Sequence, residues 1–374
     1  MPRFSSLQQA GGLGKSRCSP AQARRLPILV LAALLLGPLA GCAPEDGSGV
    51  QSQKMAAIQS RGKLICGVEG TLPGFSFVEP DGRYSGLDVD VCKSVAAALL
   101  GDANKVEYRN LNSSERFAAL ASGEVDLLSR NTTETLSRDA AGGNGLSFAP
   151  TVFYDGQGVM VPVASGIKGL KDLAGKPICV ESGTTTELNL ADRMRELNVA
   201  YTPLKFQTSD QTYAAYLGAR CVAVTSDRSQ LAGKRSSFPN ADAHALLPEV
   251  MSKEPLSPAS VNSDPAWADA VRWSIYALMQ AEELGLTQAN VDAKFSEANE
   301  NKNLADLRRF LGIEGDFGKQ LGLPSDFAFQ AVKAVGNYGE VFDRNVGPAS
   351  KLKLERGINQ QWKQGGLIYA PPFR

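Results

Sequence analysis

Histidine is almost absent from this chain of 374 residues, which has one, His244. No Ser-His-Asp order, HExxH spacing or CxxC spacing is present, so the sequence offers no metal or cofactor site, and any catalysis would depend on acidic residues. An excess of charge is also missing, because 39 basic residues balance 39 acidic ones. That balance argues against a nucleic-acid or membrane-surface partner. What remains is a globular composition, 43% hydrophobic and 21% charged, at a length that suits two lobes.

The N-terminal stretch contains no acidic residue up to position 41, and a basic region there precedes the apolar run at 26–40. Because that run is too short and too close to the terminus for a mature transmembrane helix, we predict that residues 1–41 are an export signal. The run ends in LAGC, residues 39–42, which resembles the lipobox of bacterial lipoprotein signals. This resemblance implies that Cys42 is lipidated and becomes the new N-terminus. An ordinary signal peptide with a chance cysteine is the alternative.

Residues 42–54 are small and polar, and they have nothing to bury. We predict that they are a flexible tether, so that the folded part begins at residue 55. The tether would let the folded part work at some distance from a membrane that holds the lipid.

Four cysteines remain beyond the tether: Cys66, Cys92, Cys179 and Cys221. In an oxidising compartment an even set favours disulfides, and three pairings are possible. We favour Cys66 with Cys92 and Cys179 with Cys221, because each pair then closes a short loop inside its own lobe. Four separate buried thiols are the alternative interpretation.

Beyond residue 60 the pattern alternates between strands and helices. The stretch 63–128 predicts the order βαβαβ, and its last strand is followed by SRNTTETLSRD at 129–139. In parallel sheets ligands bind at the carboxyl ends of strands, which places these donors where a ligand would lie. The pattern restarts near residue 170, so we predict two similar lobes. The extended segments 153–161 and 252–261 would cross between them, and the largely helical part from 265 on would return to the first lobe.

Five stretches in this order resemble one family: GRYSGLDVDVCKSVAAAL, RFAALASGEVDLL, TETLSRD, VESGTTTELNLAD and the closing GGLIYAPPFR. They are similar to the amino-acid-binding proteins of ABC importers, solute-binding protein family 3, most closely the general L-amino-acid-binding branch. The resemblance implies an α/β fold of the two-lobe periplasmic-binding-protein (type II) kind, with mixed sheets flanked by helices and two crossing hinge strands. We expect residues 55–157 plus 260–374 to form lobe 1 and residues 158–259 to form lobe 2.

The resemblance also implies ligand contacts in the first lobe. Arg138 falls where the family has the arginine that grips the ligand's α-carboxylate, a task that suits the planar fork of a guanidinium. Asn131 and Thr133 fall on positions that contact the α-amino and carboxylate groups. For Arg138 the alternative is a surface arginine paired with Asp139 or Glu134.

In the second lobe, Thr184 and Thr185 would open a helix whose first N–H groups favour an anion. Asp227 sits where the family places the carboxylate that pairs with the ligand's ammonium group. Thr184 to Thr186 could instead be only a helix cap, and Asp227 only a turn residue.

Other positions leave the range of ligands open. For Arg130, a salt bridge within the lobe and a contact to the ligand's side chain are equal alternatives. Where many relatives stack an aromatic ring on the ligand, the alignment places Leu72, with Phe75 nearby, and we expect Phe75 to be core more than stack. Because the expected cleft carries several polar side chains, polar amino acids or a broad range fit better than aliphatic ones alone.

The resemblance implies a periplasmic, non-enzymatic and monomeric binding protein, anchored through Cys42. It would close its lobes on an L-amino acid and deliver it to a membrane permease of an ABC importer, with no cofactor, metal or nucleic acid. Two alternatives stay open: a sensor that presents its ligand state to a membrane receptor, and a dehydratase-type enzyme on the same fold.

Overall fold

The computed structural model describes residues 52–374, which belong to one compact unit that spans residues 48–374. The predicted signal segment, Cys42 and the predicted tether as far as residue 51 lie outside the described residues. Helix α1 (Gln53–Arg61) is capped by Ser52, whose hydroxyl accepts a hydrogen bond from Met55 N at 3.0 Å. The end of the predicted tether, residues 53–54, is therefore helical, because a cap fixes the start of the helix there.

The first sheet collects strands from three parts of the chain in the order β5-β1-β6-β15-β7. Strand β1 is parallel to β5 and β6, whereas β15 is antiparallel to β6 and β7. The strands are β1 (Leu64–Val68), β5 (Val106–Asn110), β6 (Leu127–Leu128), β7 (Leu146–Phe148) and β15 (Ala259–Val261). The sheet confirms the predicted βαβαβ unit, and the stretch 129–139 begins where β6 ends.

The helices of the first lobe begin and end at local signals. Helix α2 (Leu87–Leu100) lies between Gly86 and Gly101, both at positive φ, where glycine has no steric penalty. Almost all of α2 is buried, because β1 packs on one side of it and helices from the end of the chain pack on the other. The further elements are α3 (Arg116–Ser122), α4 (Leu136–Asp139) and a small antiparallel sheet of β2 (Thr71–Leu72), β3 (Ser76–Val78) and β4 (Tyr84–Ser85), which the sequence did not predict.

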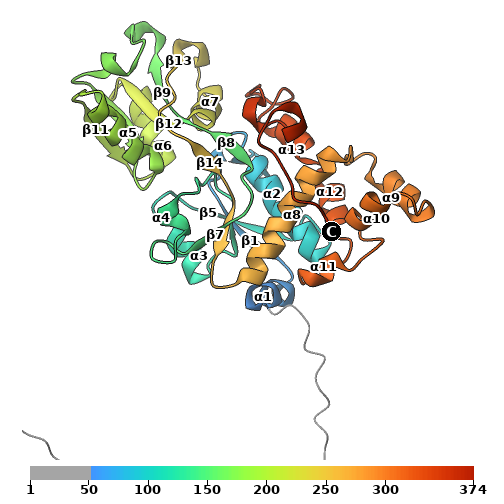
Figure 1. Cartoon of the computed structure of the whole chain (residues 1–374). Coiled ribbons are helices and arrows are strands. Elements are labelled where there is room, and N and C mark those ends of the chain that lie inside the picture. The colour runs from blue at the N-terminus through green and yellow to red at the C-terminus, as the bar shows by residue number, and fades with distance from the viewer. Residues whose placement is uncertain (1–51) are drawn as a thin grey trace, which may run out of the picture. The chain divides into compact units, whose positions relative to one another are not determined.

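The second sheet repeats this plan in the order β11-β10-β12-β9-β13, with β10 parallel to both neighbours and β9 antiparallel to β12 and β13 (Figure 1). Its strands are β9 (Gln157–Pro162), β10 (Pro177–Glu181), β11 (Thr202–Phe206), β12 (Ala223–Asp227) and β13 (His244–Leu246). Its helices are α5 (Thr185–Glu196), α6 (Ser209–Leu217), α7 (Arg228–Ser236) and the 3-10 turns η1 (Val163–Ser165), η2 (Leu170–Leu173) and η3 (Ala241–Ala243). The prediction of two similar lobes is confirmed.

Two short strands, β8 (Phe153–Asp155) and β14 (Glu254–Leu256), pair antiparallel between the two sheets. Strand β8 leads into β9 of the second sheet, and β14 leads into β15 of the first. They fall within the two segments that the sequence predicted to cross between the lobes. We expected Gln157 in lobe 1 and Ala259 in lobe 2, each as the last residue before a boundary. Gln157 instead pairs with Asp227 in the second sheet, and Ala259 pairs with Leu128 in the first.

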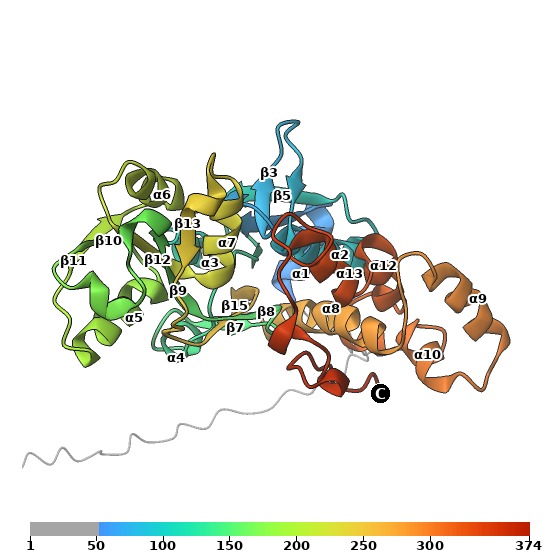
Figure 2. The ribbon, with the colours of Figure 1, turned by 90° about the horizontal axis from the view of Figure 1, so that it is seen from above.

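The last part of the chain is helical and covers the first lobe. Its elements are α8 (Pro265–Glu283), α9 (Val291–Glu300), α10 (Ala305–Phe310), α11 (Phe317–Gln320), α12 (Phe327–Val335), α13 (Tyr338–Asn345), η4 (Gly357–Asn359) and η5 (Trp362–Gln364). Helices α8, α12 and α13 pack against α2, and Figure 2 shows these helices at the end of the molecule away from α5 and α6. Trp267 of α8 is fully buried, and its Nε1 donates to Asp126 O at 3.0 Å. The predicted return of the chain to the first lobe is confirmed.

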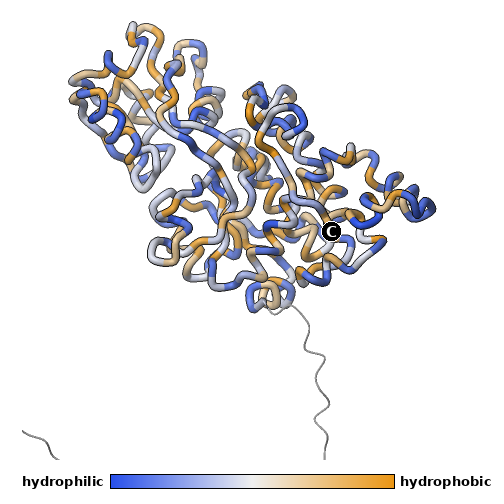
Figure 3. The backbone as a smooth tube through the Cα atoms, in the orientation of Figure 1, coloured by the Kyte–Doolittle hydropathy of each residue, from blue (hydrophilic) through white to orange (hydrophobic). Residues whose placement is uncertain are grey.

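The colours of Figure 3 follow this packing, with hydrophobic stretches along α2 and α8 and a mostly hydrophilic α9 at the outer end. One large hydrophobic core joins β1, α2, α8, α12 and α13, and two smaller clusters fill the second lobe. Within residues 52–374, no helix combines the length and the apolar character needed to cross a membrane.

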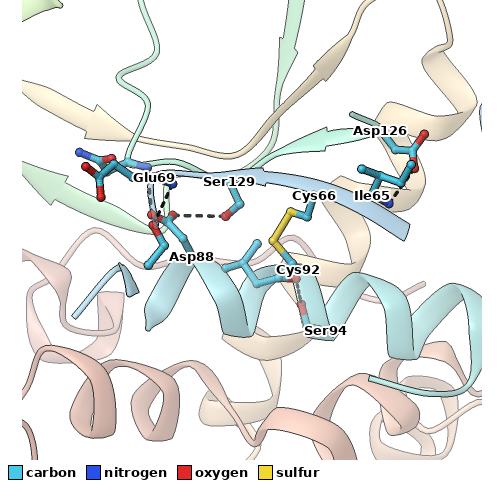
Figure 4. Close-up of a disulfide and its surroundings, with 11 residues drawn as sticks. Ile65, Cys66, Glu69, Asp88, Cys92, Ser94, Asp126 and Ser129 are labelled. Carbon is cyan, nitrogen blue, oxygen red and sulfur yellow. Dashed lines mark hydrogen bonds between the residues drawn. A yellow bond between two sulfur atoms is a disulfide. The ribbon is translucent and has the colours of Figure 1, made fainter. Parts of the chain in front are cut away.

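Each lobe contains one disulfide, in the pairing that the sequence favoured. Cys66 of β1 is bonded to Cys92 of α2, with a Cα–Cα distance of 6.3 Å (Figure 4). Cys179 of β10 is bonded to Cys221, which lies just before β12, with a Cα–Cα distance of 5.6 Å. Each bond therefore ties a strand to its own lobe and leaves the two lobes free to move relative to each other.

Candidate functional site

A small cavity of about 20 Å³ lies where the carboxyl ends of the parallel strands of both sheets meet. Its wall comes from both lobes: Ser113, Arg116, Arg130, Asn131 and Thr133 on one side, and Glu181, Thr184, Thr185, Thr186, Ser226, Asp227 and Gln230 on the other. All of these side chains are polar, and among the described residues that line the cavity none is aromatic. The site therefore suits a small polar ligand.

The first-lobe wall is rich in buried arginine. Arg116 and Arg130 line the cavity, and Arg138 of α4 lies beside it, donating from Nη1 to the Thr133 carbonyl oxygen at 2.6 Å. Burial, with the charges of Arg130 and Arg138, holds the pKa of Arg116 well below its ordinary value. Burial is also the main cause that lowers the pKa of Arg138 to about 10. Three guanidinium groups in one buried region favour an anionic group between the lobes.

The second-lobe wall carries acidic side chains. Asp227, at the end of β12, is buried, and its pKa is raised well above the ordinary value by burial and then by the nearby carboxylates of Asp155 and Glu254. Glu181, at the end of β10, has its Oε1 atom 3.6 Å from Arg130 Nη2. Basic side chains of the first wall thus face acidic side chains of the second, and Arg130 and Glu181 approach each other between them.

Several buried atoms in the cavity wall have no hydrogen-bond partner among the described residues. They are Arg116 Nε, Asn131 Oδ1, Glu181 Oε1 and Asp227 Oδ1. A buried polar atom without a partner costs about 1–3 kcal/mol. A ligand that carries both donors and acceptors would satisfy donors on the first lobe and acceptors on both, which is the arrangement a zwitterion requires.

The loop after β6 is held by hydrogen bonds to Asp88 at the start of α2. Asp88 accepts from Ser129 Oγ at 3.2 Å and from Asn131 N at 3.0 Å, and Figure 4 shows Asp88 and Ser129 facing each other. Burial raises the pKa of Asp88 to about 6. Asn131 has a φ of 35°, a backbone conformation that costs energy and persists only where the surroundings enforce it. These bonds fix the loop that presents Arg130 and Thr133 to the cavity.

The N-terminus of α5 forms part of the other wall. Thr184 is the cap of α5, since its hydroxyl accepts from Glu187 N at 3.1 Å and donates to Glu181 O at 2.7 Å. The Thr184 hydroxyl is therefore used within the lobe, as the capping alternative anticipated. The first N–H groups of a helix have no partner inside it, so the turn at Thr185 and Thr186 still offers backbone donors at the cavity.

The two lobes are in contact around the cavity. Asn131 Nδ2 donates to Gln230 Oε1 at 3.2 Å, and Lys234 Nζ donates to Thr71 Oγ1 at 2.9 Å. Thr133 Oγ1 donates to Glu254 Oε2 at 2.5 Å on the hinge strand. The described state is thus a closed one.

Three of the expected ligand residues are not in the cavity wall: Arg138, which lies beside it, and Leu72 and Phe75. Leu72 and Phe75 are both fully buried in the large core of the first lobe. Phe75 packs edge-on against Phe153 with ring centroids 5.3 Å apart, because β8 brings that ring over the small sheet. The position expected for an aromatic clamp is therefore filled by core packing.

The sequence analysis missed Arg116, Glu181, Gln230 and Glu254. Glu181 had a detectable signal, since it is charged and ends a predicted strand, whereas Arg116 opens the helix that follows one. Gln230 and Glu254 carried no such signal, because their approach to the cavity depends on how the lobes meet.

The fold and the site define a two-lobe binding protein with a polar cavity between its lobes. The chain belongs to the bacterial extracellular solute-binding proteins, family 3, whose model matches residues 64–306. The chain is 47% identical over 329 residues to the general L-amino acid-binding periplasmic protein AapJ of Rhizobium johnstonii, covering 87% of this chain and 94% of that protein. It is 46% identical over 346 residues to the glutamate/glutamine/aspartate/asparagine-binding protein BztA of Rhodobacter capsulatus, covering 92% and 97%.

Among solved structures, the chain resembles an ABC transporter periplasmic binding protein from Brucella ovis with glutathione bound. That likeness has a TM-score of 0.82 and 45% identity, and it covers 87% of this chain and 100% of the other. A cysteine-binding protein from Campylobacter jejuni is similar with a TM-score of 0.55 and 26% identity, covering 61% of this chain and 88% of that one. The predicted family and the two-lobe fold are confirmed.

Proposed function

We propose that this chain is the substrate-binding component of an ABC importer and binds L-amino acids, polar ones or a broad range, between its two lobes. The observation that carries the proposal is the division of charge in the cavity, with buried arginines on the first lobe facing Asp227 and Glu181 on the second. An α-amino acid carries a carboxylate and an ammonium group, which match these two walls. The names of AapJ and BztA support this class of ligand.

In this proposal each expected residue has a role. Arg138 and the backbone donors at Thr185 bind the α-carboxylate, with Thr133 beside them. Asp227 accepts hydrogen bonds from the ammonium group, and Asn131 uses its unpaired Oδ1 there. A ligand ammonium group beside Asp227 would lower the raised pKa of that carboxyl.

Side-chain selectivity falls to the remaining polar groups. Arg130 is already bonded within its lobe, from Nε to Leu111 O at 2.7 Å, while its Nη2 faces Glu181. Thr184 serves through its backbone, since its hydroxyl caps α5. Arg130 and Glu181 can therefore separate from each other. Arg130 would then bind an acidic ligand side chain, and Glu181 would bind a basic one.

We further propose that the protein acts without catalysis. Its one histidine, His244, lies on β13 and does not line the cavity, and its Nδ1 is 2.7 Å from the Tyr216 hydroxyl. Burial lowers the pKa of His244. The ring is thus engaged in the second lobe, away from the position that an acid or base would need.

A membrane permease as partner, a monomeric state and a lipid anchor at Cys42 in the periplasm complete the proposal. The anchor is tested by expressing the full chain and Cys42→Ala in a Gram-negative host and separating membranes. We expect the wild type in the membrane fraction and the variant among the released periplasmic proteins. Equal fractionation of both would contradict the anchor.

The first test of binding is the thermal melting of a tether-free protein with each common L-amino acid, and with glutathione, at about 1 mM. Micromolar affinity would stabilise the protein by about 4 kcal/mol at this excess. Arg138→Ala should weaken binding about a hundredfold, because a charge-assisted bidentate contact is lost. The exposed Arg195 of α5 provides the control, and Arg195→Ala should bind as the wild type does. Absence of any shift would overturn the amino-acid assignment, and uptake by reconstituted permease would separate transport from sensing.

A further inference from the structure

Hinge strand β8 has an outer edge whose backbone groups β14 cannot satisfy. Tyr154 lies directly opposite Pro255 in the antiparallel pair. Because proline has no N–H group, these two residues do not exchange ladder hydrogen bonds, and the N–H and C=O groups of Tyr154 turn to the other edge of β8. A buried strand edge of this kind needs a partner.

The side chain of Asn359 covers that edge. Tyr154 N donates to Asn359 Oδ1 at 2.7 Å, and Asn359 Nδ2 donates to Tyr154 O at 3.0 Å. One amide therefore satisfies both backbone groups, as an adjacent strand would. Asn359 is 4% exposed, so water does not compete for these bonds.

The two residues before Tyr154 are held by the same part of the chain. Tyr338 Oη donates to Val152 O at 2.9 Å. The ring of Phe342 stacks on Phe153, with centroids 5.8 Å apart and an angle of 5° between the planes. Three consecutive hinge residues, 152–154, are thus fixed by side chains from the C-terminal segment.

This segment is in turn fixed to the first lobe. Arg356 forms an ion pair with Glu282 of α8, and its Nη2 donates to Asn359 O at 3.0 Å. Its guanidinium also lies over the Tyr338 ring, 5.2 Å from the centroid. Asn359, which forms the hydrogen bonds to Tyr154, is therefore itself held in place by the first lobe.

The next residues of the hinge belong to the second lobe. Asp155 Oδ2 accepts from Ser229 N at 3.0 Å, and Gly156 O accepts from Arg228 N at 2.9 Å, both at the start of α7. The change from first-lobe contacts to second-lobe contacts thus takes place between Tyr154 and Asp155.

We propose that residues 338–359 form a hinge clamp, and that Asn359 is a positioning residue that keeps the bending of β8 at one place. The clamp lies wholly beyond residues 64–306, the part that the family model matches. Its link to ligand affinity rests on the proposed function, whereas its effect on the ligand-free lobes does not.

The clamp favours closure through entropy. Contacts between the lobes already order the hinge in the closed state, whereas the open state has only the hinge strands and the clamp. Loss of the clamp therefore increases the number of hinge conformations more in the open state than in the closed one. Closure then costs more conformational entropy. Ligand affinity falls by the same factor as the closed population.

The test compares Asn359→Ala with Gln361→Ala. Gln361 is a buried amide in the same segment, but it donates to Met279 O and Glu282 of the first lobe and does not touch the hinge. We expect both variants to lower the melting temperature. Only Asn359→Ala should weaken the binding of L-glutamine, about fivefold, while Gln361→Ala stays within about twofold of the wild type.

The open-state distribution is measured without ligand, by pulsed electron paramagnetic resonance between spin labels at the exposed positions Ala121 and Ala191, one on each lobe. Asn359→Ala should broaden the distance distribution, and Asn359→Asp, which keeps only the acceptor for Tyr154 N, should fall between it and the wild type. Equal distributions in Asn359→Ala and Gln361→Ala would overturn the clamp. If the wild type binds no amino acid, the proposed function fails, and these distributions still decide the clamp.

Discussion

The Glu254 carboxylate accepts a 2.5 Å hydrogen bond from the hydroxyl of Thr133, which joins hinge strand β14 to the loop after β6. The same oxygen accepts from Thr185 Oγ1 at 2.9 Å, and the other oxygen accepts from Asn189 Nδ2 at 2.8 Å. Thr185 and Asn189 belong to α5 of the second lobe. One buried carboxylate thus ties the hinge to both lobes next to the cavity.

Glu254→Gln should weaken closure, because all the groups around this carboxylate donate to it and an amide replaces one acceptor by a donor. Two donors would then face each other without water, at a cost of about 1–3 kcal/mol. We expect a lower melting temperature and weaker ligand binding by calorimetry. The exposed Glu134 gives the control, and Glu134→Gln should leave both unchanged. Wild-type affinity in Glu254→Gln would show that the network is not needed for closure.

Gly233→Ala should hinder closure without destabilising the ligand-free protein. A Cβ atom at Gly233 of α7 would lie 2.7 Å from Pro73 O, a backbone atom of the other lobe. The clash exists only when the lobes are closed, whereas alanine favours the helix in every state. Ligand affinity should fall at least tenfold, a loss of about 1.4 kcal/mol, with no fall in the melting temperature of the ligand-free protein. Gly142→Ala, where nothing lies within 4 Å, is the control, and unchanged affinity in Gly233→Ala would refute the prediction.

Ligand affinity should rise with pH through the titration of Asp227. Burial and the charges of Asp155 and Glu254 raise the pKa of Asp227 above 3.8, so the ligand-free folded protein holds a proton that the unfolded chain releases. Ligand-free stability therefore falls as pH rises through that window, whereas an ammonium ligand favours the ionised carboxylate and releases the proton.

The measurement is calorimetry between about pH 5 and 8, in buffers of different ionisation enthalpy. Asp227→Asn should bind weakly and without proton release, while the exposed Asp242→Asn should follow the wild type. Ligand binding is a better readout than the melting temperature. Burial also raises the pKa of Asp88 to about 6, so the titration of Asp88 changes the melting temperature in the same pH range. Proton uptake on binding would be incompatible with the role given to Asp227.

Loss of the second-lobe disulfide should lower stability more than loss of the first. The loop between Cys179 and Cys221 spans 42 residues, against 26 for Cys66 and Cys92. The chain-entropy model assigns about 4 kcal/mol to the longer loop and slightly less to the shorter. Urea unfolding of the two double serine variants measures this order. The opposite order would indicate that the denatured chain, and not loop length, sets the difference.

Much of the fold was predictable because its signals are local. Glycine caps flank α2, and Thr184 caps the start of α5. These residues lie within one turn of the helix ends, so the sequence alone indicates where the helices begin or end. The cysteine pairs followed from their places in two separate βαβ units. The small sheet of β2, β3 and β4 was missed because strands of two or three residues carry too short a pattern.

The candidate site was predictable only in part. Arg138, Thr133 and Asp227 were named from a resemblance, and the structure brings them to or beside one cavity. Leu72 shows the limit of position alone, since a residue at the right place in the chain can turn into the core, as we expected for Phe75. Whether a side chain faces a cavity depends on the packing of neighbours that lie far away in sequence, here Phe153 and the first-lobe core.

The sequence by itself determined the order of strands and helices, the repeat of one lobe plan and the family, because caps, periodicity and short motifs act within a few residues. The tertiary structure alone decided that Arg116, Glu181 and Gln230 meet across the cleft and that Asn359 holds Tyr154 of the hinge. Those contacts join residues far apart in the chain. Their geometry is set by how whole sheets and helices pack, and no local pattern encodes it.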